Sequence, residues 1–390
     1  MRRVAPPSGC WGNSDENPMI SPIGLTRELI HFDTVNPPGN EAPCARHLGR
    51  ILEQAGLQTR YTGMGGNREN LVAWIGGGGG KLPLAFTGHV DVVPLGAAPW
   101  NVEPFAGAIA DGKIYGRGSS DMKSGVAAFV SAAVKLAPRL GGTPGLVLVI
   151  TAGEECGCEG ARLLVREGLA PQAGALIVGE PTANRVLAGH KGVFWLEAVA
   201  RGVTAHGSLP EEGINAVYKA ARATLALASF DFSQDKHPVL GPPTLNVGWL
   251  RGGMNVNSVP DEARFGIDVR IVPGVDRERL LERFSAATGG EVSFEVKGAS
   301  DAVWTDPGDP WIADAASIVR AVTGHAPPIG GATYFTDAAP LKPAMGNPPT
   351  IILGPGEPAQ AHQTGEYCFI SRIEEAEAIY SETIARWCGL

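Results

Sequence analysis

The chain has 390 residues and a formal net charge of −8, with 44% hydrophobic and 18% charged residues. This length suits about two domains, and the acidic balance argues against a nucleic-acid partner. No apolar run is long enough to span a bilayer, so we expect no membrane partner either. The 53 glycines and 31 prolines favour a loop-rich α/β enzyme over a helical scaffold.

The first 18 residues carry two arginines but no apolar stretch after them, which does not fit a signal peptide. We predict that residues 1–18 form a disordered leader, with Met19 as an alternative start. The six cysteines, at positions 10, 44, 156, 158, 368 and 388, form no dense framework. We therefore expect reduced thiols in a cytoplasmic protein.

After the leader, strand and helix patterns alternate, which predicts a mixed sheet covered by helices. The predicted helices are Pro22–Phe32, Glu41–Ala55, Lys123–Leu136 and Gly160–Glu167, and the strands are Asn70–Ile75, Leu84–Thr87, Leu146–Thr151 and Ala175–Val178. The five glycines of Gly76–Gly80 lack the spacing of a phosphate-binding loop. We predict a flexible hairpin turn there instead.

From about Val193 the pattern changes to strand, helix, two strands, helix and strand, which is the order of a small ferredoxin-like α+β domain. The segments are Phe194–Ala200, Gly213–Ala228, Thr244–Leu250, Glu262–Ile271, Arg277–Ala287 and Glu291–Val296. Alternation resumes with Pro310–Thr323, Thr350–Leu353 and Arg372–Trp387. We predict that 193–299 is a lid or dimerisation domain inserted into a catalytic domain made of 19–192 and 300–390.

Metal-ligand residue types stand where the predicted strands end. They are His89, the pair Glu154–Glu155, Glu180 and, further into its loop, His362, while Asp121 precedes a helix. Ligands bind at the carboxyl ends of strands in open α/β sheets, so these side chains can converge. Two imidazoles and three carboxylates, with Asp121 bridging, suit two zinc-like ions that share one water.

Two further carboxylates have predicted roles beside these ligands. Asp91 lies two residues after His89 on the same face of an extended chain and can accept the other ring N–H of His89. One of Glu154 and Glu155 can ligate, which leaves the other free as a general base. A single His or Glu at a strand end is usually structural. The signal lies in five such positions, with no H-E-x-x-H or G-x-S-x-G motif competing.

The motifs GHVDVVP, GRGSSDMKSG, GEE, GEPT and AHQTGEY, with RGVTAHGSLP in the inserted domain, resemble the dinuclear metallo-deacylase and exopeptidase family. Its members include acetylornithine deacetylase, succinyl-diaminopimelate desuccinylase, aminoacylase and glutamate carboxypeptidase. The resemblance runs from about Pro22 to the C-terminus. It implies hydrolysis of the amide bond of an N-acyl amino acid by a metal-bridged hydroxide.

The resemblance also implies individual roles. His89 and Glu180 would bind one zinc ion, or cobalt or manganese, and Glu155 and His362 the other. Asp121 would bridge them, often with a cis peptide after it, while Asp91 supports His89 and Glu154 acts as the base.

In the inserted domain, His206 matches a histidine that stabilises the oxyanion and, in dimeric relatives, enters from the partner subunit. This implies a homodimer. Asn257 matches a substrate-contacting asparagine. Arg270 lies on a polar strand face, where it is either a solvated charge paired with Asp268 or a clamp on the substrate carboxylate.

Two segments depart from the family pattern. Cys156 and Cys158 follow the GEE motif, either as small buried residues or as a soft ligand or oxidation target. Gly330–Pro340 differs from the commonest form of the family's substrate loop. The alternatives that stay open are a metallo-dipeptidase or carboxypeptidase and, from other classes, a non-catalytic binding protein on the same fold or a structural zinc protein.

Overall fold

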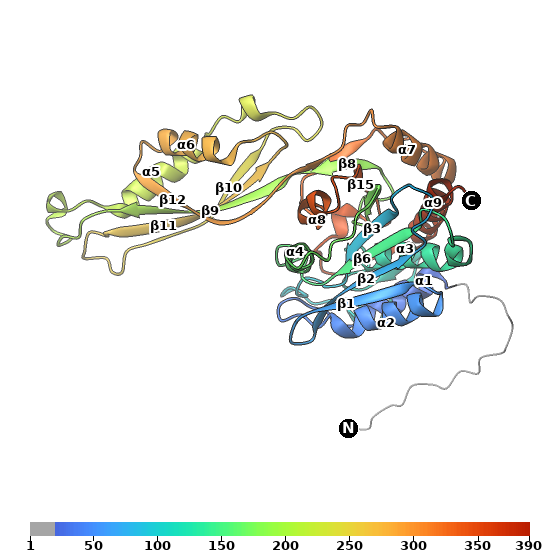
Figure 1. The fold of residues 1–390 in the computed structure, drawn as a ribbon. Helices are drawn as coiled ribbons and strands as arrows, with labels where there is room; N and C mark the ends of the chain where they lie inside the picture. Colours follow the sequence, from blue (N-terminus) through green and yellow to red (C-terminus); the bar gives the residue numbers. More distant parts are fainter. Residues whose placement is uncertain (1–19) are drawn as a thin grey trace, which may run out of the picture.

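The structure is a computed structural model that describes residues 20–390. The predicted leader, Met19 and Cys10 lie outside the described residues. Figure 1 shows a helix-covered body with a second, smaller body projecting from one end of its sheet. This confirms the predicted fold class, a mixed α/β domain with a separate antiparallel α+β domain. In the described part of the chain, no helix is both long and apolar enough to cross a membrane.

The large sheet has nine strands in the order β1-β2-β6-β3-β7-β15-β8-β13, and β14 pairs with β8. Their bounds are β1 Gln58–Gly65, β2 Arg68–Ile75, β3 Leu84–His89, β6 Leu146–Thr151, β7 Ala175–Val178, β8 Leu187–His190, β13 Val303–Trp304, β14 Gly330–Ala332 and β15 Thr350–Ile352. The strands β6, β3, β7 and β15 at its centre are mutually parallel. Their carboxyl ends therefore meet at one edge.

Residues that alternate along the central strands face two different helix layers. Leu148 of β6 packs in the core beneath α1 (Pro22–Ile30), α2 (Ala42–Gln54), α3 (Lys123–Leu136), α7 (Pro310–Thr323) and α9 (Ile370–Cys388). Its neighbour Val149 faces α4 (Glu159–Arg166) and α8 (Ala338–Ala344). Side chains along β6 alternate between the two faces, and helices cover both faces, so both faces of β6 are apolar.

The glycine-rich segment Gly76–Gly80 is not a hairpin turn, so that prediction is wrong. β6 lies between β2 and β3, and both Ile75 and Leu84 pair with its first residue, Leu146. The segment therefore crosses the end of β6. At Gly76, φ is +83° and a Cβ would lie 2.6 Å from the Cα of Gly145, so this crossing requires glycine.

The small sheet has the order β10-β11-β9-β12, and every neighbouring pair is antiparallel. Its elements are β9 Gly192–Arg201, α5 Ala216–Ala228, β10 Thr244–Gly252, β11 Glu262–Ile271, α6 Arg277–Ala287 and β12 Val292–Ser300. This is the predicted βαββαβ order. The helix α5 begins at Ala216, three residues later than predicted, because the Asn215 side chain caps it by accepting from Tyr218 N.

Short strands absent from the prediction complete the large domain. β16 (Tyr367–Phe369), β5 (Lys113–Tyr115) and β4 (Ala108–Ala110) form a three-stranded sheet. Runs of three residues carry too little periodicity to be recognised in a sequence.

Candidate active site

The predicted metal ligands gather at the edge where the parallel strands end. His89 is the last residue of β3, Glu155 follows β6, and Glu180 follows β7. Asp121 lies two residues before α3, and the peptide bond after it is cis, as the resemblance implies. His362, with φ at +63°, lies in the loop between β15 and β16. Chain topology thus brings five distant residues together.

These side chains form two groups that share Asp121, and the ligand atoms within each group lie within 4.8 Å of one another. In the first group, His89 Nε2 lies 3.3 Å from Asp121 Oδ1 and 3.6 Å from Glu180 Oε1. In the second, His362 Nε2 lies 3.5 Å from Asp121 Oδ2 and 3.1 Å from Glu155 Oε2. Each group offers three N/O ligands around one centre, as an open zinc site requires.

The electrostatics of the cluster fit divalent cations. Burial, with help from neighbouring carboxylates, raises the pKa values of Glu154 and Glu180 well above their ordinary values. Burial lowers the pKa of His89, but Glu180, Asp121 and Asp91 outweigh it and raise that pKa well above its usual value. Acidic groups crowded out of water in this way are stabilised by positive charge.

A buried oxygen supports the same conclusion. Glu155 Oε1 has no hydrogen-bond partner among the described residues, and an unpaired buried carboxylate oxygen is costly unless a cation faces it. Neither cysteine after the GEE motif belongs to a ligand group. The donor set is therefore oxygen- and nitrogen-based, which suits zinc, cobalt or manganese.

Asp91 has contacts that differ from the predicted one. The ring Nδ1 of His89 lies 2.9 Å from the backbone carbonyl of Asp91 and 3.5 Å from its carboxylate. The carboxylate instead accepts from Glu154 N at 3.1 Å, Glu155 N at 3.2 Å and Asn36 Nδ2 at 3.0 Å. The carboxylate therefore holds the Glu154–Glu155 turn, and the backbone carbonyl of Asp91 lies nearest to the ring Nδ1 of His89.

Behind Glu154 lies a second buried carboxyl group that the sequence did not single out. Cys158 Sγ lies 3.8 Å from Glu154 Oε1, and Asp337 Oδ2 accepts from Thr151 Oγ1. Burial raises the pKa of Asp337 to about 6.

Cys158 is a small buried residue, whereas Cys156 is exposed. The described cysteines are all free.

An ion pair fixes the loop that carries Asp121. Glu366 accepts from Arg117 Nη1 at 2.7 Å and from the backbone N–H groups of Gly118, Ser120 and Asp121 at 2.8–3.0 Å. Both charged side chains are almost fully buried. The AHQTGEY motif contains Glu366, but only the fold shows that it contacts a loop some 245 residues away.

A cavity of about 340 Å³ opens over the cluster. It is lined by Asp121, Glu154, Glu155, Glu180, Pro181, Trp195, Arg270, Tyr334, Phe335, Pro358, Ala361 and His362. Arg270 thus lines the cavity from the small domain. It also pairs with Asp268, with Nε 3.0 Å from Oδ1 and Nη2 3.0 Å from Oδ2, so both predicted roles remain open.

His206 and Asn257 are not among the residues that line this cavity. They neighbour each other, since Gly207 N donates to the Asn257 carbonyl at 2.8 Å. Both lie at the outer end of the small sheet, because β9 runs away from the large domain before His206 (Figure 1). Ten extended residues span about 33 Å, so His206 is far from the cluster of its own chain.

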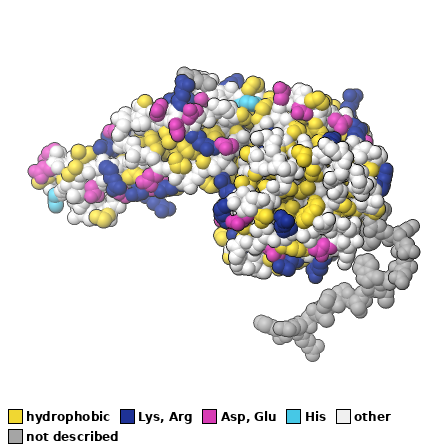
Figure 2. Space-filling model, in the orientation of Figure 1, with side chains coloured by type: hydrophobic (Ala, Val, Ile, Leu, Met, Phe, Trp, Pro, Cys, Tyr) yellow, Lys and Arg dark blue, Asp and Glu magenta, His cyan; other side chains and the backbone are white. Residues whose placement is uncertain are grey.

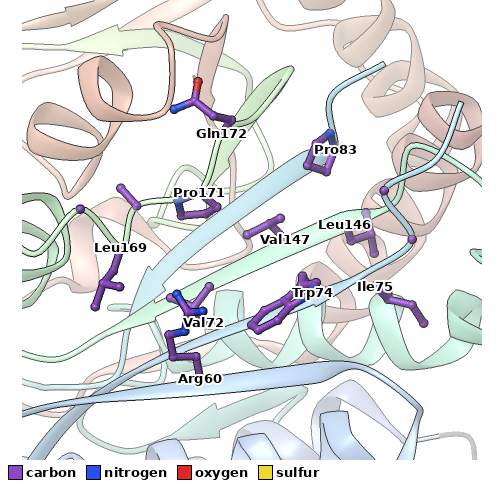
Figure 3. A pocket seen from close by; sticks show the side chains of 14 residues that line it. Arg60, Val72, Trp74, Ile75, Pro83, Leu146, Val147, Leu169, Pro171 and Gln172 are labelled. Atoms are coloured by element: carbon purple, nitrogen blue, oxygen red, sulfur yellow. The ribbon is translucent and has the colours of Figure 1, made fainter. Parts of the chain in front are cut away.

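A second cavity, of about 420 Å³, lies away from the ligand cluster, near the beginning of β3 and β6, beside Trp74, Val147, Leu169 and Pro171 (Figure 3). Figure 2 shows hydrophobic side chains gathered on the face of the large domain that is turned toward the viewer. None of the described residues that line the cavity is His, Cys, Asp or Glu. It shares no described lining residue with the cavity over the ligand cluster and is separate from the candidate active site.

Comparison with known proteins identifies the family. The model for "Peptidase family M20/M25/M40" matches residues 85–386. The chain belongs to this family. The resemblance inferred from the motifs is therefore confirmed, and the protein is a metallohydrolase of the M20 group, either a deacylase or an exopeptidase.

Individual M20 relatives match over nearly their whole length. Acetylornithine deacetylase from Myxococcus xanthus is 34% identical over 379 residues, which cover 93% of this chain and 96% of the relative. A succinyl-diaminopimelate desuccinylase from Cereibacter sphaeroides is 32% identical over 383 residues, covering 94% and 98%. The structure of an M20 family metallo-carboxypeptidase from Sulfolobus solfataricus has a TM-score of 0.80 at 18% identity, covering 95% of this chain and all of the other. That likeness shows the fold.

Proposed function

We propose that the protein hydrolyses the amide bond of an N-acyl amino acid. The observation that carries this proposal is the pair of ligand groups that share Asp121, with Glu154 and Arg270 lining the same cavity. The deacylase relatives favour an acyl substrate over a peptide, because acetylornithine deacetylase and succinyl-diaminopimelate desuccinylase match at 34% and 32% identity. A dipeptidase or carboxypeptidase is the alternative, since the metallo-carboxypeptidase shares the fold.

Two divalent ions, zinc or alternatively cobalt or manganese, would be held by His89, Asp121 and Glu180 and by Asp121, Glu155 and His362. When bound, such ions polarise a carbonyl and lower the pKa of water to about 7. Asp91, through its contacts to Glu154 N and Glu155 N, positions this pair of side chains.

Glu154 is the general base in this proposal. Its side chain lines the cavity but belongs to neither ligand group, so it is free to accept a proton from water and to pass it to the leaving amine. The Arg270 guanidinium binds the substrate carboxylate, and movement of the small domain over the cavity excludes water.

His206 stabilises the oxyanion from a partner subunit, with Asn257 contacting the substrate beside it. The length of β9 supports this role, because it separates His206 from the cavity of its own chain. Exposed apolar side chains on the small domain support a homodimer: Tyr218 is 65% exposed, Leu225 71% and Met254 96%. Burying them would place α5 and the turn between β10 and β11 of one small domain against the partner.

A substrate panel tests the proposal. Protein reconstituted with zinc, cobalt or manganese is incubated with N-acetyl amino acids, N-succinyl amino acids and dipeptides, and the released amine is measured. We expect turnover of at least one acyl series that chelator abolishes and metal restores. Turnover of dipeptides alone would establish the exopeptidase alternative. No turnover of any substrate by metal-loaded protein would overturn the proposal.

A further inference from the structure

We infer that the substrate's amino-acid side chain is apolar, and that Trp195 and Phe335 determine this specificity. The inference rests on the proposed function and names its substrate class. It departs from acetylornithine and succinyl-diaminopimelate, whose amino-acid parts carry a second amino group.

The apolar surface comes from both domains. Trp195 lies on β9 of the small domain, and Phe335 lies in the loop between β14 and α8 of the large domain. Their rings meet at an angle of 82°, with centroids 6.1 Å apart. Trp195 is a large aromatic residue that lines the cavity and is 36% exposed. This exposed ring surface is available to an apolar group of the substrate.

The position of Arg270 assigns this surface to the amino-acid part of the substrate. The Arg270 guanidinium lies 5.8 Å from the centre of the Phe335 ring, and Asp268, its ion-pair partner, is the cross-strand neighbour of Trp195. Bonds to Asp268 use Nε and Nη2, which leaves Nη1 for a carboxylate. When the carboxylate of the substrate binds to Nη1, the side chain on the substrate's α-carbon lies beside the two rings.

The charges in the cavity disfavour a cationic side chain. The carboxylates that line it are Asp121, Glu154, Glu155 and Glu180, and the proposed function uses all four at the reacting bond. Among the described lining residues, no other acid remains to pair with a second ammonium group. Apart from Arg270 and the ligand residue His362, the other residues of the wall are proline, alanine and aromatic residues. An ammonium group would lose its hydration there without gaining a partner.

A matched pair of substrates tests the inference. N-acetyl-L-norleucine and N-acetyl-L-ornithine have side chains of the same length that end in a methyl and an ammonium group. We expect kcat/KM to favour norleucine at least about tenfold, since apolar pockets discriminate single groups by about 10- to 200-fold. Trp195→Ala and Phe335→Ala should each reduce this ratio at least about threefold.

Trp74→Ala provides the control, because Trp74 lines the separate cavity of Figure 3 and should leave the substrate ratio at its wild-type value. The ratio does not depend on the fraction of folded protein, so poor folding of a variant cannot mimic the effect. A preference for ornithine, or an unchanged ratio in both aromatic variants, would overturn the inference while leaving the proposed function intact. Failure of both substrates, with turnover of dipeptides alone, would overturn both.

Discussion

Replacing Asp91 by asparagine should damage the site although the two side chains have the same shape. The Asp91 carboxylate is fully buried and accepts three hydrogen bonds, from Asn36 Nδ2, Glu154 N and Glu155 N. Burial raises its pKa, but His89 and the hydrogen bonds outweigh burial and lower it. The fold therefore stabilises the charged form, which asparagine cannot provide.

The geometry gives the size of the effect. With its oxygen in the place of Oδ2, an asparagine keeps the bonds from Asn36 and Glu155, but its NH₂ group then faces Glu154 N. One buried N–H is left without an acceptor, which costs about 1–3 kcal/mol. The misplaced Glu154 and the altered environment of His89 should lower kcat/KM by about 10- to 100-fold, the usual effect of removing a group that orients metal ligands.

Urea unfolding, metal content and kcat/KM on the best acyl substrate measure these effects. Asp33→Asn is the matched control: Asp33 is exposed and its Oδ1 accepts from Val35 N, a bond that asparagine keeps. We expect the control to change stability by less than about 0.5 kcal/mol. Wild-type stability and turnover in Asp91→Asn would refute the assigned role.

Glu154→Gln should keep the metal content of the wild type but lose about 10²–10⁴-fold in kcat, because the base is absent; normal turnover would exclude Glu154 as the base. His206→Ala should lower kcat about 10²–10³-fold with metal content intact, and an unchanged kcat would contradict the oxyanion role. Burial lowers the pKa of His190 from 6.5 to about 4, so its contribution to stability is complete above pH 6.5 and is lost as the pH falls towards 4. Between pH 7 and pH 4, the unfolding free energy of the wild type should therefore fall by about 3 kcal/mol more than that of His190→Asn, measured by urea unfolding; parallel pH profiles would show that His190 is not responsible.

The convergence of most of the candidate ligand side chains could be predicted from the sequence because its physical cause is local. His89, Glu155 and Glu180 stand at or shortly after the ends of apolar strands, and the parallel order of β6, β3 and β7 brings those ends together. The order of strands was harder to predict. Gly76–Gly80 was expected to be a hairpin turn because nothing between residues 76 and 84 indicates that a strand 60 residues later inserts there.

Long-range hydrogen bonds were beyond sequence reasoning for a similar reason. The contacts of Glu366 with the loop before α3 cross about 245 residues, and the burial of Asp337 beside Thr151 depends on the packing of α8. The Trp195–Phe335 contact joins two domains. None of these pairs has a spacing or period that a single sequence displays.

The chain enters and leaves the small domain through neighbouring strands. Val193 near the start of β9 is paired with Ser300 at the end of β12, so the two connections lie about 5 Å apart. A linker of two or three residues can therefore replace the whole segment 194–299 without stretching the backbone of the large sheet. The shortened chain would keep the strands that carry the ligand residues and would lack Trp195 and Arg270, which makes the contributions of the two halves separable in the laboratory.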